Sequence, residues 1–214
     1  LERVLAWSTG AAIAPGMSAN EYTEGEYGSS VYSAAAVALE TVRRVFGRER
    51  FERALQRYAQ ENRFSHPTPK ELAEAFDHVY GKGFFARVVR PLLIAGERAG
   101  VRIVRAHSER VESRYHTEVW ARRTGEVPLP TWLAAYDHDG LVIERIAFPG
   151  ELATLHVSFD SEQEVARLAL DPDRALLVDA SVDDQVVDFA KAPRSSWTLR
   201  ALAAAQALLS WLGP

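Results

Sequence analysis

The hydrophobic period of this chain changes near Gly100, and that change constrains its fold more than any other feature. Before Gly100, apolar residues recur at steps of three and four, which is the period of an amphipathic helix. After it, short runs alternate apolar and polar residues with the period of two that is typical of strands. The sequence therefore predicts an α+β chain in two segregated parts, with helices over residues 1–99 and an antiparallel β-sandwich over residues 100–190.

The helical part is predicted to contain a helical hairpin. The first helix covers residues 30–46 and ends at Gly47, and the second covers residues 48–62. Residues 83–97 are compatible with a later helix that Pro91 breaks or kinks. The apolar face of the first helix consists of Val31, Ala35, Ala38, Val42 and Val45.

A third helix between these segments carries the clearest boundary signals in the chain. Thr68 is followed three residues later by Glu71, which is the pattern of a capping box. Pro69 occupies the first helical position and Gly81 follows the last one. We therefore expect a short helix from Pro69 to the residue before Gly81.

Roughly seven short strands are predicted after Gly100, because β-branched and aromatic runs are separated there by turn signals such as Asp139-Gly140. This number and spacing favour a sandwich of immunoglobulin-like architecture, without the cysteine pair of antibody domains. The predicted strands begin at Val101 and continue over residues 115–123, 131–137, 141–148, 152–160, 165–171 and 175–181.

Residues 191–214 form a separate C-terminal segment that is apolar from Trp197 to Leu212. We interpret it as a packing helix, because the apolar run is shorter than the ~20 residues that a bilayer crossing requires. A truncated membrane segment is the alternative. The chain begins at Leu1 without a methionine or a signal-peptide pattern, and we interpret it as part of a longer protein.

Composition excludes several classes of function. The chain of 214 residues has no cysteine, which excludes disulfides, cysteine nucleophiles and thiolate metal sites. Its net charge of −4 gives no electrostatic footprint for nucleic acid. It also contains no His-Glu-x-x-His motif, no glycine-rich phosphate loop and no Gly-x-Ser-x-Gly elbow. The arginines between Arg43 and Arg57 alternate with glutamates, which indicates a salt-bridged helix surface.

One predicted strand has a mixed set of titratable side chains. His116 and Glu118 alternate onto one face beside Trp120, and His107 and Glu109 can approach from the neighbouring strand. Imidazole and carboxylate groups are ligands for metals such as zinc. The same pattern is also typical of a solvated sheet face with mixed charges.

Residues 28–85 resemble a region of the aminopeptidase N family of gluzincin zinc metallopeptidases, downstream of the zinc site. The shared features are Val31-Tyr32 at a helix start, a small-residue helix ending near "GRERF", and "PT" at the cap of a later helix. The switch to a sandwich with "DPDRALLVD" near its end is similar to the domain that follows catalysis in that family. Family members commonly continue the tyrosine with a Lys-Gly pair, whereas this chain has Ser33-Ala34.

This resemblance implies a bacterial-type parent enzyme. The helices would be the end of a thermolysin-like catalytic domain and would wall a peptide cleft, and the sandwich would brace that domain. Tyr32 would donate a hydrogen bond to the oxyanion formed on the peptide carbonyl. The zinc ligands would lie before Leu1, so this segment alone would bind no metal and be inactive.

The resemblance also sets the expected partners, which are a peptide substrate and the N-terminal catalytic half of the parent. Its location would be cytoplasmic or membrane-associated. Two alternatives are open. Tyr32 could instead be a core tyrosine whose hydroxyl bonds a backbone carbonyl. The chain could also be a non-catalytic adaptor, a helical scaffold with an immunoglobulin-like module and Trp120, Trp132 and Tyr136 as anchors.

Overall fold

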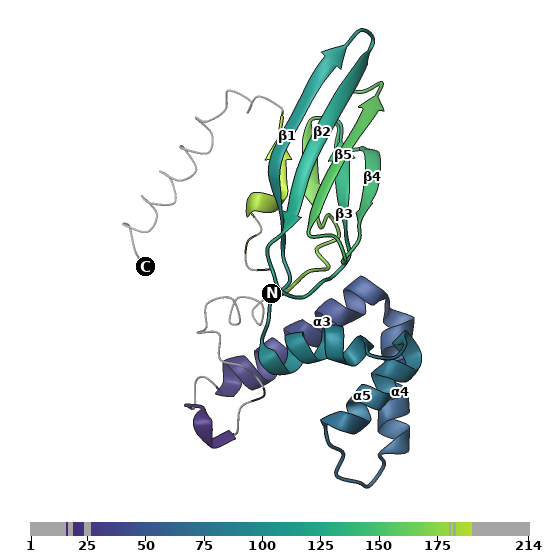
Figure 1. The fold of residues 1–214 in the computed structure, drawn as a ribbon, viewed down its shortest axis with the longest axis vertical. Coiled ribbons are helices and arrows are strands. Elements are labelled where there is room, and N and C mark those ends of the chain that lie inside the picture. The colour runs from purple at the N-terminus through teal and green to yellow at the C-terminus, as the bar shows by residue number, and fades with distance from the viewer. Residues whose placement is uncertain (1–15, 17–18, 24–26, 180, 182, 190–214) are drawn as a thin grey trace, which may run out of the picture.

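The computed structural model describes residues 16, 19–23, 27–179, 181 and 183–189. It is a mixed α+β fold, as the change of period predicts (Figure 1). The helical elements are η1 (Ala19–Glu21), η2 (Gly28–Ala34), α3 (Ala35–Phe46), α4 (Arg48–Glu61), α5 (Pro69–Tyr80), η3 (Phe85–Val89), η4 (Pro91–Ala95) and η5 (Asp183–Gln185). The strands are β1 (Val101–Val111), β2 (Arg114–Arg123), β3 (Thr131–Tyr136), β4 (Val142–Phe148), β5 (Thr154–Ser161), β6 (Arg167–Leu170) and β7 (Val186–Asp188).

The predicted helical hairpin is present as α3 and α4, but it begins differently from the prediction. Residues 28–34 form the π-helix η2, and the α-helix starts only at Ala35. Gly47 separates α3 from α4 with a φ of 92°, a backbone conformation that glycine adopts without strain. The buried positions of α3 are Val37, Ala38, Thr41 and Val42.

The capping box of α5 is confirmed. The N–H of Thr68 donates to the Glu71 carboxylate at 2.7 Å, and the N–H of Lys70 donates to the Thr68 hydroxyl at 3.3 Å. Pro69 is the first helical residue and Gly81 ends the helix with a φ of 103°. These contacts satisfy N–H groups that the first helical turn cannot pair within the helix.

The helix predicted over residues 83–97 appears as two π-helical elements, η3 and η4, which meet at Pro91. The carboxylate of Asp77 in α5 holds the start of this region. It accepts the N–H of Gly83 at 2.7 Å and that of Phe85 at 2.8 Å. Aromatic rings pack between these elements and the hairpin. They belong to Phe46, Phe51, Phe76, Tyr80, Phe84 and Phe85.

The strands form two antiparallel sheets, with the orders β1-β2-β5 and β4-β3-β6-β7. Six of the predicted strands match β1 to β6 closely. Both sheets direct apolar side chains into one hydrophobic cluster that also includes residues of the helices. That cluster contains, among others, Val42, Val89, Val119, Leu133, Leu155 and Leu168.

The strand predicted over residues 175–181 is wrong, and the strand after β6 is instead β7. Leu176 and Val178 are buried while their neighbours are partly exposed, which imitates the alternation of a strand. The N–H groups of Ala175 and Leu176 bond the Asp171 carboxylate instead of a neighbouring strand. A side chain therefore turns the backbone where the sequence pattern indicates a ladder.

The segment between η4 and β1 is held against the sheets by backbone hydrogen bonds. The N–H of Val127 donates to the carbonyl of Arg98 at 3.1 Å, and that of Thr124 donates to the carbonyl of Gly100 at 2.9 Å. The predicted C-terminal helix over residues 191–214 lies outside the described residues. Within the described part, no helix has the length and apolarity that a membrane crossing requires.

Candidate functional site

Tyr32 lies in the last turn of the π-helix η2, with 61% of its surface exposed. Its backbone carbonyl accepts the N–H of Ala35, but its hydroxyl makes no hydrogen bond to any residue that the structure describes. Tyr32 is therefore not a buried core tyrosine whose hydroxyl bonds a backbone carbonyl, which was one of the two alternatives from the sequence. Its phenol is available to a group outside the described residues.

The ring of Tyr32 belongs to a row of three tyrosines. Tyr27 meets it edge to face, with centroids 5.7 Å apart and planes at 79°. Tyr22 meets Tyr27 in the same way, at 5.7 Å and 80°. Edge-to-face pairs are a preferred arrangement of aromatic rings, so this row restrains a side chain that is otherwise exposed.

The polar strand cluster is brought together on the outer face of the three-stranded sheet. Thr117, Val119 and Ala121 of β2 are buried, so their neighbours point outward. The strand register places the outward residues in three cross-strand rows. The rows are Arg105, Trp120 and His156; His107, Glu118 and Ser158; and Glu109, His116 and Asp160.

The side chains of this face contact one another in pairs. His116 Nδ1 lies 2.7 Å from an oxygen of Asp160, and this hydrogen bond raises the pKa of His116 above its usual value. His107 lies 3.5 Å from Glu109, and Trp120 stacks on His156 with Arg105 over its ring. Among the described residues no three His, Asp or Glu side chains are grouped to hold a metal ion. The side chains of His107, Glu109 and Asp160 on this face are more than half exposed.

A groove of about 610 Å³ lies along β6 and β7 of the four-stranded sheet. Tyr136 and Asp139 line it near the β3–β4 turn, and Arg174 lines it near the loop after β6. Arg167 and Asp188 face each other across the two strands and form an ion pair at 2.5 Å. The groove combines aromatic and charged groups in a volume that suits a small ligand or a short peptide segment.

The three proposed adaptor anchors have different surroundings. Trp132 is 43% exposed and has the Arg145 guanidinium over its ring at 5.0 Å. Tyr136 is half-buried in the groove, and Trp120 is half-buried between its two stacking partners. Of the three, Trp132 alone is exposed rather than half-buried.

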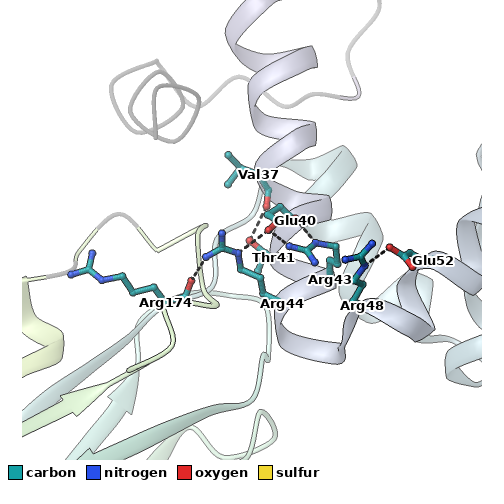
Figure 2. A network of polar contacts seen from close by, with 8 residues as sticks. All are labelled: Val37, Glu40, Thr41, Arg43, Arg44, Arg48, Glu52 and Arg174. Carbon is teal, nitrogen blue, oxygen red and sulfur yellow. Dashed lines mark hydrogen bonds and ion pairs between the residues drawn. The ribbon is translucent and has the colours of Figure 1, made fainter.

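The arginine-rich surface is salt-bridged, as its alternating charges predict (Figure 2). Glu40 pairs with Arg43 at 2.6 Å and with Arg44 at 2.8 Å, and Arg48 pairs with Glu52 at 2.5 Å. Arg44 also donates to the backbone carbonyl of Arg174 at 3.1 Å, which connects α3 with the loop after β6. Four arginines of this surface are therefore paired with glutamates, and Arg44 also has a structural role.

Sequence reasoning identified Tyr32 but missed its neighbour Tyr27 and the groove beside Tyr136. The five-residue spacing of Tyr22, Tyr27 and Tyr32 is visible in the sequence. In an α-helix that spacing would put the rings on different faces, so it gave no signal. The groove depends on the pairing of β6 with β7, which the sequence did not predict.

Comparison of this chain with known protein families and with curated proteins gives no match. The resemblance to the aminopeptidase N family stays a prediction from the sequence.

Proposed function

We propose that this chain is the C-terminal part of a bacterial zinc aminopeptidase-like protein. Its helices line a peptide cleft, and Tyr32 supplies a hydrogen bond to the oxyanion formed during peptide hydrolysis. The observation that carries the proposal is the exposed Tyr32 phenol, whose hydroxyl is not bonded to any described residue. Its position in a π-helix adds support, because π-helical turns are frequent at functional sites.

The chemistry assigned to Tyr32 follows from its own hydroxyl. Nucleophilic attack on a peptide carbonyl concentrates negative charge on the carbonyl oxygen. A neutral donor that is already oriented toward that oxygen stabilises the transition state more than the substrate, and such a donor typically contributes ~10²- to 10³-fold in rate. A phenol already bonded within its own fold would first have to break that bond.

The zinc ligands are assigned to the polypeptide before Leu1. We assign no zinc ligand to this chain. The proposal for this chain is therefore confined to the walls of the cleft and to the donor. The partners proposed are a peptide substrate and the catalytic half that carries the ligands.

We also propose that the two sheets form an immunoglobulin-like sandwich, which follows the helices in the chain and braces the catalytic part. The antiparallel orders β1-β2-β5 and β4-β3-β6-β7 support this, as does the arrangement of the elements in Figure 1. Val119 and Leu155 of one sheet belong to the same buried cluster as Leu133 and Leu168 of the other. Apolar faces that meet in this way are the core of a sandwich.

The test uses the product of the complete reading frame. We expect it to hydrolyse an amino-acid amide and to lose this activity with a chelator. Tyr32→Phe removes only the hydroxyl, and we expect kcat to fall ~10²- to 10³-fold with little change in KM. Tyr58→Phe, the same change on α4, is the control and should retain wild-type activity. A Tyr32→Phe enzyme with wild-type kcat would remove Tyr32 from the mechanism.

The adaptor alternative is favoured by two observations, the groove beside Tyr136 and the exposed ring of Trp132. As an adaptor, the complete product would show no chelator-sensitive hydrolysis. The same assay therefore separates the two functions.

A further inference from the structure

We propose that Tyr27 is a positioning residue that orients the phenol of Tyr32, and that the π-helical winding of η2 brings the two rings together. The catalytic consequence of this inference rests on the proposed function. Its structural part, the dependence of the Tyr32 ring on Tyr27, does not.

The winding of η2 decides whether the two rings can meet. In an α-helix of 3.6 residues per turn, residues five apart differ by about 140° around the axis, so their side chains leave on different faces. In a π-helix the backbone bonds connect residues five apart, which brings such residues onto the same face. Tyr27 directly precedes η2 with helical dihedral angles, φ −58° and ψ −47°, and Tyr32 follows it by five residues.

The observed contact agrees with this winding. The rings lie edge to face with centroids 5.7 Å apart, and Tyr22 supports Tyr27 on its other side with the same geometry. Among the described residues, the ring of Tyr32 contacts one other aromatic ring, that of Tyr27. Because 61% of the surface of Tyr32 is exposed, few other groups restrain the direction of its hydroxyl.

Tyr27 would act through Tyr32 and would not touch the substrate. Loss of its ring would let the phenol of Tyr32 sample several directions, of which one suits the oxyanion. A misplaced catalytic group lowers the rate of the chemical step, and here we expect a loss on the order of tenfold in kcat. KM should change little, because substrate binding does not depend on the direction of this hydroxyl.

The structural part is tested on this chain by NMR. The Tyr32 ring protons should show a ring-current shift from the neighbouring aromatic ring in the wild type and in Tyr27→Phe. Tyr27→Leu keeps apolar bulk but removes the ring, and it should lose the shift while the amide spectrum of the remaining chain stays that of a folded protein. A wild-type spectrum without the shift, or a Tyr27→Leu spectrum that keeps it, would overturn the proposal.

The catalytic part is tested on the complete product, with Tyr22→Phe as a matched control that should behave as wild type. We expect Tyr27→Phe to retain kcat, Tyr27→Leu to lose about tenfold, and Tyr27→Leu to add nothing in a Tyr32→Phe background. If Tyr32→Phe lowers kcat but Tyr27→Leu does not, positioning by Tyr27 is refuted and the proposed function stands. If Tyr32→Phe itself has no effect, the proposed function fails, and the NMR result alone decides the structural part.

Discussion

Asp171 is a carboxylate that organises the loop after β6 while only 5% of its surface is exposed. It accepts the N–H groups of Ala175 and Leu176, each at 2.9 Å, and the hydroxyl of Thr131 at 3.2 Å. Its φ of 48° lies in the left-handed region, which aspartate and asparagine tolerate better than most residues. Burial raises its pKa above the usual value, and the hydrogen bonds act against that rise.

We predict that Asp171→Asn lowers the free energy of unfolding by about 1 kcal/mol at pH 7, because its amide NH2 group cannot accept the N–H of Leu176. Asp171→Ala should cost more, since it removes all three acceptor contacts and tolerates the positive φ poorly. Urea denaturation of the three proteins measures both effects. Equal stability of Asp171→Ala and wild type would contradict the structural role.

The raised pKa of Asp171 also predicts how this difference depends on pH. A carboxyl whose pKa is higher in the folded than in the unfolded state stabilises the fold most below its unfolded pKa, near 3.8. That contribution to stability declines as the pH rises through the pKa that Asp171 has in the folded state. The stability advantage of wild type over Asp171→Asn should therefore shrink between pH 3.8 and neutral pH.

At the scale of the element, α3 is connected to the loop after β6 through Arg44, which forms an ion pair with Glu40. The Glu40 carboxylate receives two hydrogen bonds from Arg43, each at 2.6 Å, and one from Arg44 at 2.8 Å (Figure 2). Arg44 in turn donates to the carbonyl of Arg174. The hydrogen bonds from Arg43 are the main reason that the pKa of Glu40 falls to about 2.

We predict that Glu40→Gln reduces stability by about 0.5–1 kcal/mol at pH 7, since all three side chains are partly exposed and water screens their attraction. A lowered carboxyl pKa contributes stability above the unfolded value of 4.5, and this is lost as the pH falls from 4.5 to about 2. Wild type and variant should therefore converge over that range in chemical denaturation. A difference that persists at pH 2 would exclude this explanation.

At the scale of the whole molecule, the close contact between the segment after η4 and the loop after β2 joins the helices to the sheets. Gly125 lies directly on this segment, and a Cβ atom there would stand 2.3 Å from the carbonyl oxygen of Arg98 and 2.6 Å from Cα of Ala99. Asp179 supports the same junction by accepting the N–H of Val101 at 3.0 Å. The nearest atoms to this Cβ all belong to the backbone of Arg98 and Ala99, so no flexible side chain could move away to make room for it.

We predict that Gly125→Ala destabilises the protein by about 1–3 kcal/mol, the usual cost of overpacking. Gly28→Ala is the matched control, because a Cβ atom at Gly28 meets nothing within 4 Å. Thermal unfolding followed by circular dichroism compares the two variants. Equal melting temperatures of Gly125→Ala and wild type would show that the junction is looser than the structure describes.

The sequence alone determined those features that depend on neighbouring residues. The periods of 3.6 and 2 predicted the mixed α+β fold, and Thr68, Pro69 and Gly81 fixed the boundaries of α5 because caps act within one helical turn. Six strands were found from their alternation. The resemblance makes Tyr32 a candidate but carries no information on its exposure.

Only the tertiary structure decided the features that depend on residues far apart in the chain. Asp171 takes the N–H groups that a strand over residues 175–181 would have used, and a burial pattern cannot reveal which acceptor a backbone group finds. The rows of the outer sheet face required the strand register, and the contact of Tyr27 with Tyr32 required a π-helix where the sequence predicts an α-helix. Local propensity fixes the period of a segment, whereas its partners and exact winding are set by the packing of the whole chain.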